Sequence, residues 1–441
     1  MPALIQILGY WTRPAAFVQQ CRARYGNRFA LRIRVPPKPL YVLTDPDEIK
    51  QMFQAPADVL HTGNGSATIE KFTGQTGLAW LDEDEHDVRR RRLNPSMHGP
   101  ALKRIEASIA EMAEQDIASW PRGEEMPLHP LIHRFTLKVI REVIFGRQPP
   151  NRADEMLDVL TEMMSFNNRP ASTMMIHRMP PMAVRLLAAF RPTGLHHFLE
   201  LRAHADSLIA EAIQERRSAG TDGNDMLSMM LNMTRDDGAP LSGVEMRDEM
   251  MTIFLAGTET TATALAWGLQ YLSREPAVRD RLVAEIDAGE DDAYLTATVQ
   301  EVLRVRPSIP QIIPRQVMKP IEIGGVRFEP GSLLWASAFL LHRDPSVYPD
   351  PLSFRPERFL DRGPGVYTWI PFGGGRIRCL GSAIAILEMK HVIRQVLARY
   401  ELCRVDSQPE APRSRSVGTV PANGMRVTLV DRSREFSLGA A

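Results

Sequence analysis

A single cysteine in a glycine-rich loop is the residue of this chain best suited to chemistry. Cys379 lies in PFGGGRIRCLGS (371–382), and a helical run, AIAILEMKHVIRQVLARY, follows it directly. The thiol is therefore expected just before a helix N-terminus, where free backbone N–H groups and the helix dipole stabilise a thiolate. Glycines would also let the backbone approach a flat cofactor closely. Those of the loop are Gly373, Gly374, Gly375 and Gly381.

Several chemistries fit such a cysteine. A lone thiolate cannot build an iron–sulfur cluster or a zinc site, but it can serve as the proximal ligand of haem. The loop lacks the GK[ST] ending of a nucleotide P-loop and the GxGxxG strand context, which disfavours phosphate binding. A nucleophilic cysteine and a purely structural one remain open alternatives. The loop by itself favours haem ligation.

A second candidate is an isolated acid. Glu259 is the only charged residue between Met250 and Arg274, in a predicted helix that contains LAGTETTATALAWG. A buried carboxylate is costly unless it is paired, protonated or in contact with water, so a functional role is expected. Gly257 and the neighbouring threonine hydroxyls, which can bond back to helix carbonyls, favour a bend and a widened, water-holding groove. A helix-packing Gly/Thr cluster is the structural alternative.

Two pairs of charged residues have helical spacing. Glu301 and Arg304 lie three apart in VQEVLRVRPS, so they share a helix face and can pair. An exposed pair of this kind would contribute little to stability. His86 and Arg90 lie four apart in EHDVRRRRLNP, where a solvated basic turn is the alternative interpretation.

The cysteine loop resembles the signature of the cytochromes P-450, which reads Phe, two variable residues, Gly, one variable residue, Arg or His, one variable residue, Cys, one variable residue, Gly. The matching residues are Phe372, Gly375, Cys379 and Gly381. Ile377 departs from the pattern, because the family usually has a haem-propionate contact there. Arg376 and Arg378 flank it, and either could replace that contact.

The predicted helix around Glu259 resembles the central-helix motif of the same family, Ala/Gly, Gly, variable, Asp/Glu, Thr. The matching residues are Ala256, Gly257, Glu259 and Thr260. The resemblance implies that Thr260 hydrogen-bonds dioxygen or its water, and that Glu259 helps to deliver protons for cleavage of the O–O bond. A thiolate opposite the oxygen favours the same cleavage.

Three other residues resemble the structural charges of the family. Glu301 and Arg304 match its ExxR motif, and Arg358 matches the arginine of its PERF motif. The resemblance implies a buried ion network that supports the cysteine loop, with a role in folding and haem incorporation. Removal of one member would leave a buried charge unpaired, at a cost of about 3–5 kcal/mol.

The resemblance also implies cations for the two propionates of haem b (iron protoporphyrin IX), which must be neutralised if the ring is buried. His86 and Arg90 resemble the family's HxxxR pair, and Arg315 resembles another propionate-binding arginine. Cys379 would be the axial ligand of the iron.

The elements that position these residues are mainly helical. Apolar residues recur three and four apart over 101–119, 128–146, 195–217, 244–272 and 275–287. Short β-branched runs, LRIRV, LYVLT, IEIGGVRF, LLWAS, ELCRV and MRVTL, predict a small, mainly antiparallel sheet. We expect a helical body (about 84–305 and 380–400) and a β lobe (about 28–60 and 311–340). Together with the resemblance, this arrangement of helical body and β lobe predicts the P450 fold, mainly α with a small β lobe, as one domain over residues 1–441.

Composition limits the partners. Lys plus Arg equals Asp plus Glu, 53 each, so no global charge favours nucleic acid. Three scattered cysteines, Cys21, Cys379 and Cys403, argue against a disulfide framework and indicate a reducing, cytoplasmic setting. The sequence shows no signal peptide or membrane anchor, so a soluble protein is expected.

The resemblance implies a haem-thiolate monooxygenase that activates O2 to oxidise a hydrophobic small molecule. The sequence has no flavin or nicotinamide fingerprint, so electrons from NAD(P)H would arrive through a separate ferredoxin or flavodoxin-type carrier with its reductase. An acidic carrier could dock on a basic patch formed by residues 89–92, Arg376, Arg378 and Lys390. A peroxide-using or substrate-rearranging enzyme, and a gas-sensing or storage haem protein, are the alternatives.

The substrate is expected to be lipophilic: a lipophilic acid, a terpenoid, a polyketide or a similar secondary metabolite. Its pocket would be lined by the 61–80 loop, the methionine-rich region 163–190, Leu255 with Ala256, and residues 310–313. Adaptable methionines would cover a greasy ligand, although ordinary packing between helices explains them equally well.

Overall fold

A computed structural model describes most of the chain. It covers residues 2–33, 39–63, 70–166, 194–220, 223, 225–235, 238–289, 291–415 and 418–432. Most of the predicted methionine-rich segment lies outside these residues, including Met174, Met175, Met179 and Met182.

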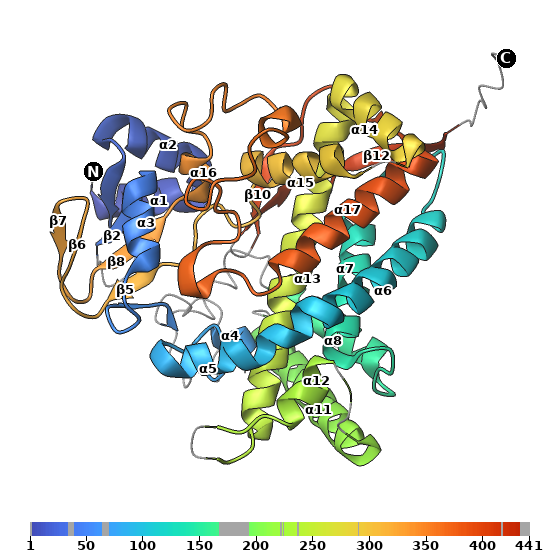
Figure 1. Cartoon of the computed structure of the whole chain (residues 1–441), viewed down its shortest axis with the longest axis horizontal. Helices are drawn as coiled ribbons and strands as arrows, with labels where there is room; N and C mark the ends of the chain where they lie inside the picture. The colour runs from blue at the N-terminus through green and yellow to red at the C-terminus, as the bar shows by residue number, and fades with distance from the viewer. Residues whose placement is uncertain are drawn as a thin grey trace.

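Helices dominate the described residues (Figure 1). They are α1 (Ala3–Thr12), α2 (Pro14–Tyr25), α3 (Pro46–Gln54), α4 (Glu70–Thr73), α5 (Glu83–Leu93), α6 (Gly99–Ala118), α7 (His129–Phe145), α8 (Ala153–Phe166), α11 (Leu195–Ala219), α12 (Met226–Leu231), α13 (Gly243–Arg274), α14 (Pro276–Ala288), α15 (Ala293–Val305), α16 (Ala338–Leu341) and α17 (Ser382–Arg399). The predicted helical body is confirmed, because its apolar stripes bury one face of each helix.

The strands are short. They are β1 (Arg28–Leu31), β2 (Leu40–Leu43), β3 (Leu60–His61), β4 (Glu125–Pro127), β5 (Arg315–Val317), β6 (Ile321–Ile323), β7 (Val326–Phe328), β8 (Leu333–Ala336), β9 (Tyr400–Arg404), β10 (Pro412–Arg415), β11 (Gly418–Pro421) and β12 (Arg426–Asp431). The largest sheet has the order β1-β2-β8-β5-β3, and β2 and β8 pair in parallel while the other pairs are antiparallel.

One strand prediction was wrong in position. The run LRIRV was expected to be a strand, but β1 covers Arg28–Leu31 and ends where that run begins. The pairing with β2 fixes this register, since Arg28 lies opposite Leu43 and Leu31 opposite Leu40. The run IEIGGVRF, which was expected to contribute to the sheet, forms a hairpin of its own, because Gly324 and Gly325 adopt the positive φ angles that its two-residue turn requires.

The long helix α13 crosses the centre of the molecule and organises the core (Figure 1). It begins with a capping box in which Ser242 and Glu245 satisfy each other's backbone N–H groups. Helices α7, α15 and α17 all pack against it, and their buried side chains form one large apolar cluster. A smaller cluster joins the main sheet to α3. The cysteine loop lies between these two parts of the core.

Candidate functional site

The cysteine loop is held by its own backbone and by α3. The Cys379 N–H donates to the Phe372 carbonyl at 2.9 Å, and Gly373 and Gly375 have φ angles of 67° and 69°. A Cβ at Gly374 would lie 2.2 Å from the Phe53 ring, and one at Gly375 would lie 2.3 Å from the Phe53 carbonyl oxygen. These two glycines were expected to admit a cofactor, but the close approach they permit is to α3.

The Cys379 side chain is accessible although protein surrounds it. The residue is exposed, yet burial raises the pKa of its thiol, and the Gly381 N–H, Arg90 and Arg378 only oppose that shift. The thiol is therefore both accessible to a ligand and desolvated by its surroundings. Helix α17 begins at Ser382, as predicted, but its N-terminus does not outweigh desolvation.

The middle of α13 provides a second accessible surface inside the molecule. Ala256 is exposed although Phe254 and Thr258 on the same helix are buried. The Thr260 hydroxyl donates to the Ala256 carbonyl at 2.7 Å, and the Ser308 hydroxyl donates to the Thr260 carbonyl at 2.7 Å. The threonines therefore bond back as expected, while α13 stays α-helical throughout.

Glu259 has partners that the sequence did not indicate. His129 Nε2 lies 3.5 Å from Glu259 Oε1, and His133 Nε2 lies 3.4 Å from Glu259 Oε2. Both histidines come from α7 and are buried. The Glu259 carboxylate therefore lies beside two imidazoles of α7.

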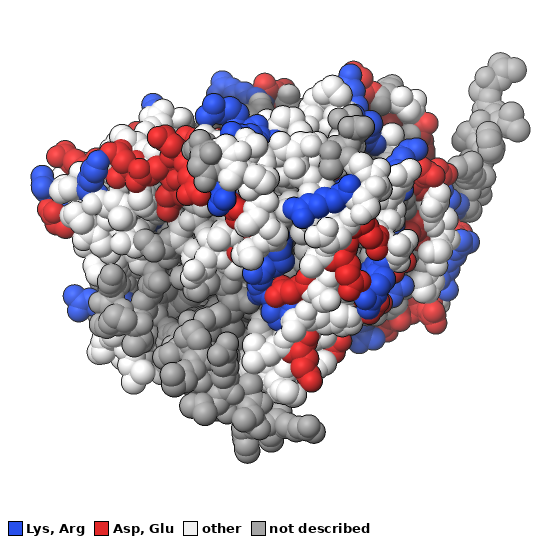
Figure 2. Space-filling view, turned by 90° about the horizontal axis from the view of Figure 1, so that it is seen from below, with Lys and Arg blue, Asp and Glu red and all other residues white. Residues whose placement is uncertain are grey.

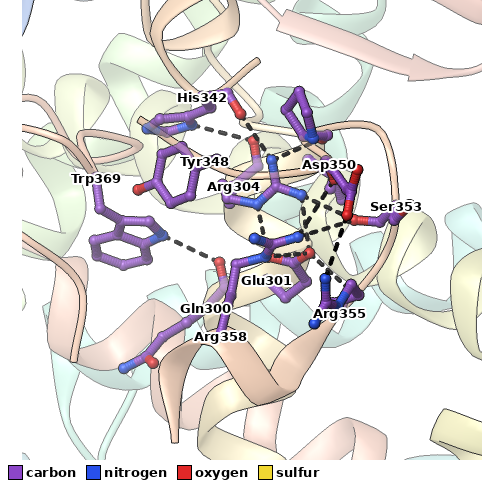
Figure 3. Close-up of polar contacts among 12 residues, drawn as sticks. Gln300, Glu301, Arg304, His342, Tyr348, Asp350, Ser353, Arg355, Arg358 and Trp369 are labelled. Atoms are coloured by element: carbon purple, nitrogen blue, oxygen red, sulfur yellow. Dashed lines mark hydrogen bonds and ion pairs between the residues drawn. The ribbon is translucent and has the colours of Figure 1, made fainter. Parts of the chain in front are cut away.

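The ExxR residues form a buried ion network with the predicted third member (Figure 3). Glu301 and Arg304 are fully buried and make two hydrogen bonds, of 2.7 and 2.8 Å. Arg358 Nε donates to Glu301 Oε1 at 3.1 Å. The guanidinium groups of Arg304 and Arg358 also donate to backbone carbonyls of 349–353, and Arg304 donates to the carbonyl of His342.

His342 connects this network to the cysteine loop by hydrogen bonds. Its Nδ1 lies 3.1 Å from the Arg304 carbonyl oxygen, and its Nε2 accepts the N–H of Ile370 at 2.9 Å. Because Nε2 accepts, Nδ1 holds the proton of the neutral ring. Trp369 adds a parallel link, since its indole N–H donates to the Gln300 carbonyl at 3.1 Å (Figure 3). The loop that carries Cys379 is thus anchored to α15.

Cationic side chains gather on another side of the loop. A small pocket is lined in part by His86, Arg315, Arg376 and Ile377. Burial, with a smaller contribution from Arg376, lowers the pKa of Arg315 to about 10. Arg315 donates to the Met52 and Gly374 carbonyls, and its Nε has no hydrogen-bond partner in the described part of the chain.

The other predicted cations differ in their surroundings. Burial is the main cause that lowers the pKa values of His86 and Arg90, and the charge of Cys379 opposes the shift at Arg90. Arg376 pairs with Asp87 at 2.8 Å and donates to the Glu83 carbonyl, whereas Arg378 is exposed.

Comparison with known proteins decides the family. The cytochrome P450 family model matches residues 2–427. The chain belongs to the cytochrome P450 family. Two curated relatives from Mycobacterium tuberculosis, "Putative cytochrome P450 135B1" and "Putative cytochrome P450 138", are each 32% identical. The alignments cover 94% and 97% of this chain and 86% and 94% of the relatives.

Solved P450 structures share the fold. A cyanobacterial cytochrome, CYP120A1, solved with retinoic acid bound, has a TM-score of 0.83 at 21% identity, with 96% of each chain covered. The haem domain of cytochrome P450DA has a TM-score of 0.82 at 24% identity, covering 97% of this chain and 95% of the other. The chain is therefore a P450 monooxygenase, an oxidoreductase that uses haem b and receives electrons indirectly from NAD(P)H.

The residues present fit haem b. A buried guanidinium whose Nε lacks a hydrogen-bond partner is suited to an anionic group such as a propionate, and Arg315 is such a cation. Cys379 offers an accessible sulfur that the surrounding protein desolvates. The protein thus supplies both a soft axial donor and a counter-charge.

The predicted basic patch needs correction. Arg89 was expected to belong to it, but its side chain is 6% exposed and pairs with Glu245 and Glu249 of α13. Lys390 pairs with Asp292. Basic and acidic residues are interspersed on the face that Figure 2 shows. Arg91 and Arg378 are the exposed members of the patch, and Arg92 is half-buried.

Two sets of residues were missed by sequence reasoning. His129 and His133 lie four apart in HPLIH, and a pair of histidines at that spacing on an apolar helix is a signal that could have been noticed. His342 follows the apolar run AFLL and carries no local sign of its link to Arg304. Among the described helices, none is long and apolar enough to span a bilayer.

Proposed function

We propose that Cys379 is the axial thiolate ligand of the haem iron and that this P450 oxidises a hydrophobic small molecule. The observation that carries the assignment is an accessible thiol, desolvated by the surrounding protein, just before the start of α17. When bound, haem b supplies the activation of O2, with the thiolate donating electron density. Cys379 would bind the iron as a thiolate, and the positive charge of the metal would offset the burial of its sulfur.

The cations around the loop hold the propionates in this proposal. Arg315 is the first candidate because it is buried without a carboxylate in ion-pair contact among the described residues. His86 and Arg90 on α5 provide further donors. Ile377 cannot donate to a propionate, and Arg378 is the better substitute for it, since Arg376 already pairs with Asp87.

Glu259 and Thr260 act on protons in this proposal. Thr260 lies one turn after the exposed Ala256, so its hydroxyl can exchange its bond to that carbonyl for one to dioxygen or water. Glu259 is the adjacent acid that passes protons toward it. Glu301, Arg304 and Arg358 support the cysteine loop and act in folding and haem incorporation.

The proposed substrate is lipophilic, such as a terpenoid, polyketide or fatty acid-like secondary metabolite. Apolar residues lie near the middle of α13 and in the segment that precedes β5, where Leu255 is half-buried and Ile313 is exposed. A separate ferredoxin or flavodoxin-type carrier with its reductase would supply the electrons.

The reduced, carbon monoxide-bound absorption spectrum tests the ligand assignment. Wild type and Cys403→Ser, a control at an exposed cysteine of β9, are expected to show a strongly red-shifted Soret band. Cys379→Ser is expected to lose that band. Its absence from folded, haem-reconstituted wild type, or its persistence in Cys379→Ser, would refute the proposal. Oxygen consumption stoichiometric with NAD(P)H then separates a monooxygenase from a peroxide-using enzyme.

A further inference from the structure

The histidine pair beside Glu259 is arranged for more than neutralisation. The two Nε2 atoms approach different carboxylate oxygens, at 3.5 and 3.4 Å. His129 and His133 are one helical turn apart on α7, so both imidazoles lie on the same side of the carboxylate. Their side chains are 6% and 11% exposed, while that of Glu259 is 19% exposed. The acid is thus the most accessible of the three groups.

The packing of α7 on α13 holds this geometry. A Cβ at Gly257 would lie 2.2 Å from Ile140 Cδ1, so a larger residue there would force the Ile140 side chain to shift. The Thr136 hydroxyl lies within hydrogen-bonding distance of both the His133 carbonyl, at 2.9 Å, and the Thr258 carbonyl, at 3.2 Å. These contacts flank Glu259 on α13 and His133 on α7.

A metal ion is not the explanation for the cluster. No group of three His, Cys, Asp or Glu residues is arranged to hold a metal in the part of the chain that the structure describes. A carboxylate with imidazole nitrogens near both oxygens is instead suited to proton exchange, because His titrates near neutral pH. Separations of 3.4–3.5 Å are long for a hydrogen bond, and catalytic contacts commonly tighten when the site is loaded.

We propose that His129 and His133 form a proton relay that recharges Glu259 from the side of α7. Each proton moves from imidazolium Nε2 to a carboxylate oxygen of Glu259, which passes it toward Thr260, and the neutral imidazole then takes a proton from solvent. One turnover combines one substrate molecule, one O2, two electrons from the carrier and two protons, and yields the oxygenated product and one water. The histidines are positioning residues that act through Glu259, so this inference rests on the proposed role of Glu259 and Thr260.

Glutamine replacements separate proton delivery from orientation. In the double variant His129→Gln, His133→Gln, each amide can reach the position of Nε2 and still donate to the carboxylate, but it cannot release a proton. We expect product formed per NAD(P)H to fall tenfold or more, with the carbon monoxide spectrum unchanged. His204→Gln is the matched control, because His204 pairs with Glu155 at 3.1 Å on the surface. It should behave like wild type.

A double-mutant cycle tests whether the histidines act through the acid. The double histidine variant should add no further loss in a Glu259→Gln background, because the relay is already interrupted. If the double variant His129→Gln, His133→Gln formed as much product per NAD(P)H as wild type, the histidines would only orient Glu259. That result would refute the relay. An additional tenfold loss in the Glu259→Gln background would refute it too.

Nuclear magnetic resonance of the reduced, carbon monoxide-bound protein gives a readout that does not depend on turnover. At a fixed pH, Glu259→Gln should change the imidazole chemical shifts of His129 or His133, because it replaces the carboxylate that lies within 4 Å of both rings. The imidazole shifts of His204 in the same spectra should not change. Unchanged imidazole shifts for both relay histidines would refute the inference. If instead Glu259→Gln and Thr260→Ala both left the product formed per NAD(P)H unchanged, the function proposed for Glu259 and Thr260 would be refuted.

Discussion

At the residue scale, burial decides which protonation state each polar group adopts. His342 is fully buried beside Arg304 and Arg343, and these three causes, burial first, lower its pKa to about 3. The neutral ring is the state that the network requires, because only a neutral Nε2 can accept the N–H of Ile370. Protonation of His342 would therefore break one of the two links between α15 and the cysteine loop, and would leave the Trp369 hydrogen bond.

This state predicts an acid sensitivity. The folded pKa of His342 lies below its ordinary value of 6.5, so the unfolded chain binds more protons between pH 6.5 and pH 3. Its contribution is complete above pH 6.5 and is lost as the pH falls through that window, at about 1.4 kcal/mol per pH unit. From pH 7 to pH 5 the free energy of unfolding should fall by about 2 kcal/mol more in wild type than in His342→Gln. Urea unfolding at the two pH values measures this.

The quantity to compare is the change in the free energy of unfolding between pH 7 and pH 5, and not its value at one pH. This is because His342→Gln also loses a hydrogen bond and will be less stable at pH 7. His204→Gln is a control on α11 that removes an exposed histidine from outside the network. Equal pH dependence of wild type and His342→Gln would show that His342 is not held neutral.

At the element scale, the site depends on how closely α7 approaches α13. Gly257 was expected to loosen the helix and open a groove, but α13 is continuous there, and the space next to Gly257 is taken by Ile140. The contact places His129 and His133 against Glu259. Helix packing thus sets the geometry of the acid.

Gly257→Ala tests this contact. The added methyl group would lie 2.2 Å from Ile140 Cδ1 and should cost about 1–3 kcal/mol through strain, more than the roughly 1 kcal/mol that alanine gains in a helix. Gly268→Ala in the same helix is the control, since its nearest contact would be 3.3 Å from Val302. Thermal unfolding should show a loss at position 257 only. Partial rescue by Ile140→Val is expected, and a stabilised Gly257→Ala would contradict the packing argument.

The sequence predicted elements better than the contacts between them. Apolar periodicity located α6, α7, α11, α13 and α14 because a helix repeats its buried face locally. Strand β1 was misplaced because its register depends on β2 and, through β2, on β8, more than 280 residues away along the chain. Glu301 and Arg304 could be paired from their spacing, whereas His342 joins them only through the tertiary fold. The same applies to His129 and His133, whose partner belongs to another helix.

At the scale of the whole molecule, charge balance leaves little field to attract a partner from a distance. Basic and acidic residues are equal in number, 53 each, and they are interspersed on the face shown in Figure 2. Several predicted docking cations are already paired, as Arg89 and Lys390 are. Docking of an acidic carrier would therefore depend on a few exposed arginines near α5.

Arg91 and Arg92 lie at the end of α5, on the helix that also carries Arg90, whose charge interacts with that of Cys379. We expect Arg91→Glu, Arg92→Glu to slow reduction by an acidic [2Fe–2S] ferredoxin about tenfold at low ionic strength, because a local charge cluster steers association. The difference from wild type should shrink as salt screens the charges. Stopped-flow reduction at several ionic strengths measures it.

Arg327→Glu is the control, since β7 lies at the outer edge of the molecule (Figure 1) and Arg327 is exposed. Equal rates for the α5 variant and wild type at every ionic strength would mean that the carrier approaches elsewhere, because two reversed charges at the docking surface cannot leave a steered encounter unchanged.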